Sequence, residues 1–216
     1  MAAASAIRPR FRGSSHRIAF FLTIPLGVAL GLEVKTSAGR AAAIAFGTSV
    51  VTMFGASALY HTVDWPEARR RWMRRLDHAG IYALIAGSYT PVGLLVLSGN
   101  WRLVVLGIVW IGAAIAIALK FFWLDAPKWL SAVIGIGLGW VAVVVFPQIL
   151  DRVGIAGSVL VLAGGLAYTA GALVYALRRP DPLPAVFGYH EVFHALVIVA
   201  VACQYSAIAF FVLPEH

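Results

Sequence analysis

LVVLGIVWIGAAIAIAL, residues 103–119, is a run of 17 residues without one charged side chain, and it decides the fold class. A helix needs roughly 20 mostly apolar residues to cross the hydrocarbon core of a membrane. Backbone groups inside lipid must pair with one another, so helices and closed barrels are the possible spans. The apolar residues are continuous rather than alternating with a period of two, which favours a helix.

The rest of the chain repeats this pattern. Of its 216 residues, 61% are hydrophobic and only 12% are charged, too few to cover a soluble domain. We therefore predict an all-α polytopic membrane protein, a seven-transmembrane helix bundle of residues 17–212 that follows a basic N-terminal segment, residues 1–16. The spans are expected near 17–34, 41–62, 76–97, 101–122, 128–148, 155–177 and 188–212.

The arginine-rich start before the first apolar run also resembles a secretory signal peptide, with a weak cleavage site at Ser37, Ala38 and Gly39. The run is about as long as a span, which favours an uncleaved anchor. Cleavage would leave six spans that run in the same directions.

Positive charge predicts the orientation. Thirteen of the 17 lysines and arginines fall on the side that holds the N-terminus, so this side is expected to be cytoplasmic. The charges lie between apolar runs rather than along one face, which favours contacts with membrane lipids and argues against nucleic acid. Cys203 is the only cysteine, so no intrachain disulfide can form.

Ionisable and hydroxyl side chains inside spans are costly and are therefore candidates for function. Under the predicted directions, three helix ends carry such groups to one depth at the cytoplasmic face. These groups are Ser57 and His61 in the span 41–62, Asp77 and His78 in the span 76–97, and His190, Glu191 and His194 in the span 188–212.

The spacing predicts a metal site. His190 and His194 are four residues apart and share one face of a helix, as do Ser57 and His61. Three neutral imidazoles and a water molecule form the usual open arrangement of a catalytic zinc site. Nitrogen ligands without thiolates favour Zn²⁺ over calcium or magnesium. A single histidine at a helix end more often packs or faces the interface, so the prediction depends on the convergence of all three.

The neighbouring groups have simpler explanations. Asp77 alone could pair with Arg74 or Arg75. His78 points roughly 100° away from Asp77 on the helix, so it is expected behind the ligands or at the interface. His16 and His216 stand at exposed ends and are expected to take no part.

His190-Glu191-Val192-Phe193-His194 matches the H-E-x-x-H motif, in which the glutamate of a zinc protease serves as general base. The motif is short and occurs by chance. An intramembrane metalloprotease is therefore an alternative.

Several separated blocks together resemble the hemolysin III family. They are Ser57-x3-His61, RLDHAGIY at 75–82, GSYTP at 87–91, and Gly188-Tyr189-His190-Glu191-x2-His194. This family is the bacterial branch of the progestin and adiponectin receptor superfamily and is related more distantly to alkaline ceramidases.

The resemblance implies seven spans, a cytoplasmic N-terminus in the bacterial inner membrane, and zinc held by His61, His190 and His194. It also implies that Asp77 orients the water that the metal activates and that Ser57 belongs to the site. The family's hydrolase activity is established for some relatives and inferred for bacterial members.

The leading hypothesis is a zinc-dependent hydrolase of a lipid amide or ester. Asp77 would accept the proton of the attacking water and pass it to the leaving group. Ser57 would donate a hydrogen bond to the developing oxyanion. Glu191 would instead fix a histidine tautomer.

Two further classes stay open: a membrane sensor whose zinc is structural, and a cytolysin. The substrate and the oligomeric state are not determined by the sequence.

Overall fold

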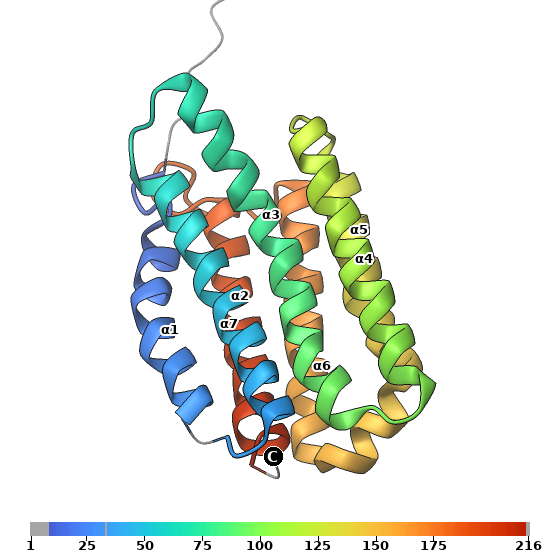
Figure 1. Ribbon diagram of the computed structural model, residues 1–216. Helices are drawn as coiled ribbons and strands as arrows, with labels where there is room; N and C mark the ends of the chain where they lie inside the picture. The colour runs from blue at the N-terminus through green and yellow to red at the C-terminus, as the bar shows by residue number, and fades with distance from the viewer. Residues whose placement is uncertain (1–8, 33, 215–216) are drawn as a thin grey trace, which may run out of the picture.

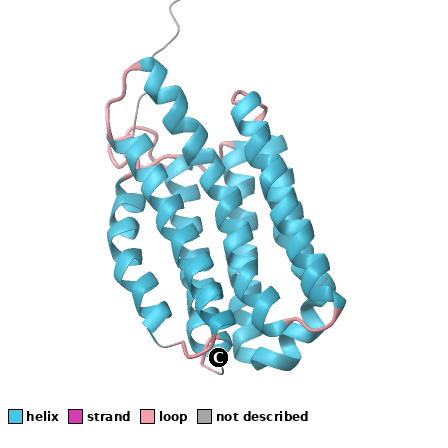
Figure 2. Ribbon diagram, viewed as in Figure 1, coloured by secondary structure: helices cyan, strands magenta, loops and turns pink. Residues whose placement is uncertain are grey.

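The computed structural model describes residues 9–32 and 34–214, and every named element in these ranges is helical. The helices form one elongated bundle in which successive segments run up and down (Figure 1), with loops only at its two ends (Figure 2). The elements are α1 (Ser14–Leu32), α2 (Ser37–Thr62), α3 (Glu67–Pro91), η1 (Val92–Val96), α4 (Asn100–Phe122), α5 (Lys128–Gly139), η2 (Trp140–Val145), α6 (Phe146–Leu177), α7 (Tyr189–Ala207) and η3 (Ile208–Val212). The predicted all-α membrane bundle is confirmed.

Six helical runs in the described residues are long and apolar enough to cross a membrane, and one of them, Lys128–Leu177, has 50 residues. A straight helix of that length would be about 75 Å long, whereas the hydrocarbon core is about 30 Å thick. The run is not straight, because Gly154 has φ 67° and ψ −177°. The chain descends along α5 and returns along α6 (Figure 1). When the run Lys128–Leu177 is divided at Gly154, the described residues contain seven segments, the number of spans that the sequence predicts.

The third helix begins earlier than the span predicted near 76–97. Residues 67–75, predicted as part of a connection, form the first turns of α3, which extends beyond the neighbouring helices at the upper end of Figure 1. Arg74 pairs with Asp125 at 2.8 Å, and Arg75 Nε donates to the Phe121 carbonyl at 3.2 Å. The suggested salt bridge from Asp77 to one of these arginines is therefore wrong, and Asp77 faces other partners.

Tight packing between α1, α2, α3 and α7 holds the ends of these helices together. A shared core contains the buried residues Phe46, Met53, Phe54, Leu84 and Val201. Glycines let α2 and α3 approach closely: a Cβ on Gly80 would lie 3.1 Å from the Met53 Cα. The end of α2 and the starts of α3 and α7 therefore lie at the same end of the bundle, which we call the histidine end.

We predict that Gly87→Ala destabilises the bundle. A Cβ at Gly87 would overlap the Ser49 side chain and lie 3.0 Å from the Ala45 carbonyl oxygen. Forcing these helices apart should cost about 1–3 kcal/mol, measurable as a lower midpoint of thermal unfolding in detergent. Gly107→Ala is the matched control, because nothing lies within 4 Å of its Cβ. Equal midpoints for the two variants would contradict this account of the packing.

Candidate metal centre

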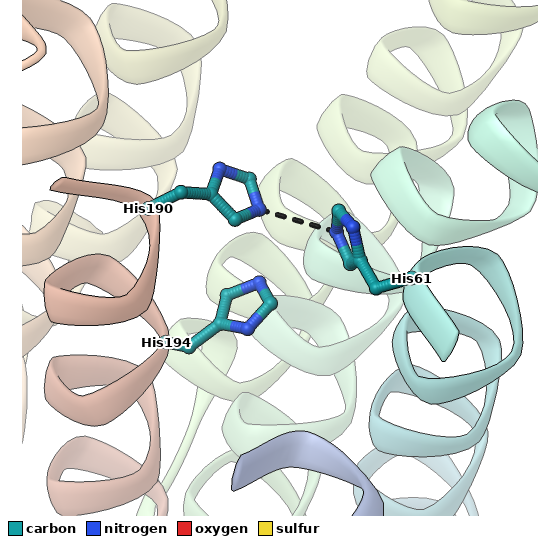
Figure 3. A group of neighbouring side chains, drawn as sticks. All are labelled: His61, His190 and His194. Carbon is teal, nitrogen blue, oxygen red and sulfur yellow. Dashed lines mark hydrogen bonds between the residues drawn. The ribbon is translucent and has the colours of Figure 1, made fainter. Parts of the chain in front are cut away.

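Three histidines from two helices meet at the histidine end. His61 comes from the last turn of α2, and His190 and His194 come from the first turns of α7. All three are buried, and their candidate ligand atoms lie within 4.8 Å of one another. The Nε2 atoms of His61 and His190 are 3.1 Å apart, and Figure 3 shows both α7 rings turned toward His61. The predicted convergence of these three residues is confirmed.

Local hydrogen bonds fix where α7 begins and hence where its histidines lie. Asp181 Oδ1 accepts the Tyr189 N–H at 2.7 Å. Glu191 Oε2 accepts the Gly188 N–H at 2.9 Å, which caps the first turn. His190 and His194 then follow one helical turn apart on the same face.

The three residues could hold a metal ion. Two nitrogens at 2.0–2.1 Å from a tetrahedral zinc would be about 3.3 Å apart, close to the observed separation of the His61 and His190 Nε2 atoms, 3.1 Å. The Nδ1 atom of His194 is buried and has no hydrogen-bond partner among the described residues. A buried nitrogen without a partner is costly, and coordination to a metal would remove that cost.

Asp77 stands behind the triad. Its side chain is buried, and Oδ2 lies 3.7 Å from His61 Nε2 and 3.5 Å from His78 Nδ1. The Nε2 of His78 lies 3.4 Å from the Tyr175 hydroxyl, so His78 faces α6 rather than the triad. Both positions agree with the sequence analysis, in which Asp77 is close to the metal site and His78 lies behind it.

Glu191 does not take the position that the zinc-protease motif requires. Its Oε1 is 2.6 Å from Arg12 Nε, and its Oε2 caps α7 at Gly188. Both carboxylate oxygens are thus occupied outside the triad. Glu191 therefore makes no contact that would fix the tautomer of a histidine in the triad. The general-base role is wrong as well, because neither carboxylate oxygen faces the triad.

His16 is the site residue that the sequence analysis missed. It was expected at an exposed end, yet only 2% of its surface is exposed. Its Nδ1 lies 2.8 Å from Ser57 Oγ, and its ring stacks on His194 with centroids 3.7 Å apart and planes 9° apart. The signal was present, because the start of the first span lies at the same predicted face as the other histidines. His216 falls outside the described residues.

A cavity of about 190 Å³ begins at this cluster and continues into the bundle. Ser57, Asp77 and His194 line its polar end, whereas Val92 and Ile149 are among the many apolar residues that line the remainder. The arrangement joins a group of possible metal ligands to an apolar chamber inside the membrane-spanning part of the protein.

Comparison with known proteins shows the family of this chain. The family model described as Haemolysin-III related matches residues 4–205. The chain belongs to this family. It is similar to Hemolysin-3 of Bacillus cereus, with 30% identity over 203 residues that cover 93% of this chain and 90% of the relative. The Hemolysin-3 homolog of Bacillus subtilis (strain 168) is 28% identical over 201 residues, with 91% of each chain covered.

We predict that the haemolysin-III related protein loses bound transition metal in the His194→Ala variant and keeps it in Glu191→Gln. The first change removes one of the three candidate ligands. The second removes only the charge that pairs with Arg12, which should cost about 1–3 kcal/mol of stability. Elemental analysis after dialysis, with thermal unfolding alongside, separates the two effects. Loss of metal from a folded Glu191→Gln protein would contradict this prediction and would show that Glu191 contributes to metal binding.

Proposed function

We propose that this haemolysin-III related protein is a zinc-dependent membrane hydrolase that cleaves an amide or ester bond of a lipid. The observation that supports it is the position of the histidine triad and Asp77 at one end of a cavity that is lined mostly by apolar residues. A purely structural metal site does not require a chamber beside it.

His61, His190 and His194 are the residues that would hold the ion, and nitrogen ligands without thiolates suit zinc. When bound, zinc acts as a Lewis acid and lowers the pKa of a water molecule to about 7. Three protein ligands, rather than four, are typical of catalytic zinc sites, which keep one position for water or substrate.

Asp77 is the proposed proton carrier. Its Oδ2 is 3.7 Å from His61 Nε2, so the carboxylate can reach a water molecule held beside the triad. It would take a proton from this water as the water oxygen attacks the carbonyl carbon, and then give the proton to the departing amine or alcohol. His78 Nδ1 lies 3.5 Å from the same oxygen.

The cavity supports a lipid as substrate. Its apolar walls would take an acyl chain, since apolar surface favours apolar ligands by roughly 25 cal/mol per Å² buried. The polar end would then receive the amide or ester group next to Asp77. Membrane lipids are thus both the solvent of the bundle and the proposed source of substrate.

We further propose that the N-terminus and the histidine end face the cytoplasm of a bacterial cell, in the inner membrane. The exposed Arg69, Arg70 and Arg71 lie at this end. At the opposite end, Lys35 lies in the connection before α2 and Arg40 lies in the first turn of α2. Positively charged connections stay on the cytoplasmic side during insertion.

The orientation can be checked by labelling single cysteines in a Cys203→Ser background. We expect Lys35→Cys to react with a membrane-impermeant maleimide in intact spheroplasts, because its side chain is exposed at the periplasmic end. Arg70→Cys should react only after the membrane is opened. The reverse pattern would place the histidine end outside.

A second candidate is a non-catalytic sensor in which zinc joins α2 to α7. It is favoured by one observation: the ligands come from two separate helices, so the metal would tie them together and contribute to folding. In such a protein Asp77 would matter little, because it is not among the three candidate ligands.

We therefore predict that Asp77→Asn keeps its fold and its metal but loses at least about 100-fold in turnover, since a positioned proton carrier contributes about 10²–10⁴ in rate. Purified, zinc-loaded protein would be assayed on a panel of N-acyl lipids and acyl esters, with zinc content and unfolding midpoint as controls. An intact zinc site without turnover of any lipid in the wild-type protein would favour the sensor.

A further inference from the structure

His16 makes two polar contacts, and together they determine where its ring proton lies. Nδ1 is 2.8 Å from Ser57 Oγ, and Nε2 is 3.4 Å from the backbone carbonyl oxygen of His194. The ring is buried, so both nitrogens depend on protein partners. A backbone carbonyl can only accept a hydrogen bond, so Nε2 must carry the proton.

The contact with the His194 carbonyl also sets the direction of the hydrogen bond between His16 and Ser57. A neutral imidazole carries one N–H, so with Nε2 protonated the Nδ1 atom is an acceptor. The Ser57 hydroxyl must then donate its proton to His16 Nδ1. Its oxygen lone pairs are left for the cavity, where Ser57 is one of the lining residues.

We propose that His16 is a positioning residue that fixes Ser57 as a hydrogen-bond acceptor in the site. This reverses the role expected from the sequence, in which Ser57 donates to a developing oxyanion. The catalytic consequence rests on the proposed hydrolase function: Ser57 would accept a hydrogen bond from the O–H of the attacking water or from the N–H of a lipid amide. The tautomer itself does not depend on any reaction.

The N-terminal segment is anchored in a way that keeps His16 in place. The Arg10 and Phe11 N–H groups donate to the carbonyls of Ala185 and Val186 in the loop before α7, at 3.0 and 3.2 Å. The Arg12–Glu191 ion pair then ties the segment to the first turn of α7.

Gly13 brings the same segment close to the end of α2. It has φ +79°, and a Cβ there would lie 2.5 Å from the His61 Cβ. A glycine satisfies both the backbone conformation and the close approach. Residues 10–13 therefore bridge α2 and α7 and deliver the ring of His16 between Ser57 and His194.

Stacking on His194 gives the ring a second constraint. The two imidazoles lie nearly parallel, with centroids 3.7 Å apart, while the Phe54 ring meets His16 edge-on at 4.9 Å. These contacts limit rotation of His16, so its Nδ1 remains directed at Ser57. A group held by packing and hydrogen bonds in this way can orient another side chain.

The decisive measurement is the tautomer of His16 from ¹⁵N NMR of histidine-labelled protein in lipid bilayers. His16→Gln identifies the signal by its disappearance. We expect protonated Nε2, bare Nδ1, and a change in the Nδ1 signal in Ser57→Ala. Ser88→Ala is the matched control, because this serine also lines the cavity but donates to the Leu84 carbonyl at 2.8 Å. A protonated Nδ1, or an Nδ1 signal insensitive to Ser57→Ala, would overturn the proposal.

A double-mutant cycle tests the functional link. His16→Ala and Ser57→Ala should each lower turnover by about 10-fold, the cost of one hydrogen bond of about 1.4 kcal/mol. The double variant should be no worse than Ser57→Ala alone, because His16 acts through Ser57. His16→Asn, whose side-chain oxygen can accept the same hydrogen bond, should recover most of the activity. If the loss of turnover in the double variant equals the product of the two single losses, His16 does not act through Ser57.

A comparison of two substrates identifies the group that donates a hydrogen bond to Ser57. With a matched amide and ester of one acyl chain, a larger loss on the amide in Ser57→Ala indicates the substrate N–H, and equal losses indicate the attacking water. The NMR result needs neither substrate nor metal. A protein with the expected tautomer and no hydrolysis of either lipid would disprove the proposed function and leave the positioning of Ser57 intact.

Discussion

The cost of burying polar side chains in an apolar bundle governs the histidine end of this protein. Lipid offers no hydrogen bonds, so each buried donor or acceptor needs a partner from the chain or a bound ion. His16, Ser57 and Asp77 find partners in one another or in neighbouring imidazoles. His194 Nδ1 has no hydrogen-bond partner among the described residues, and His194 is one of the three residues that could hold an ion.

The same constraint explains why Glu191 lies within an H-E-x-x-H motif and yet has its carboxylate outside the histidine triad. The start of a helix leaves backbone N–H groups without intrahelical partners. Glu191 satisfies one of them at Gly188 and balances its own buried charge with Arg12. Its carboxylate thus fixes where α7 begins, and the positions of the candidate ligands His190 and His194 depend on it through the backbone.

Much of the architecture and part of the site could be predicted from residue patterns. The apolar runs predict the spans, and Gly154 lies at the predicted connection between 148 and 155, where the long helical run reverses. The i,i+4 spacing predicts that His190 and His194 share a face, and the alternating direction of the spans brings His61 to the same depth. The start of α3 was misjudged, because a basic amphipathic stretch can continue a helix beyond the hydrocarbon core.

The sequence by itself determined the helical membrane fold, the segments that cross and the end of the bundle at which the polar residues gather. These depend on local hydrophobicity and helical period, which adjacent residues specify. Only the tertiary structure decided that His16 joins the site and that Glu191 leaves it. Both outcomes depend on how residues 10–13 pack across the ends of α2 and α7, and such contacts between distant segments leave no periodic pattern in the chain.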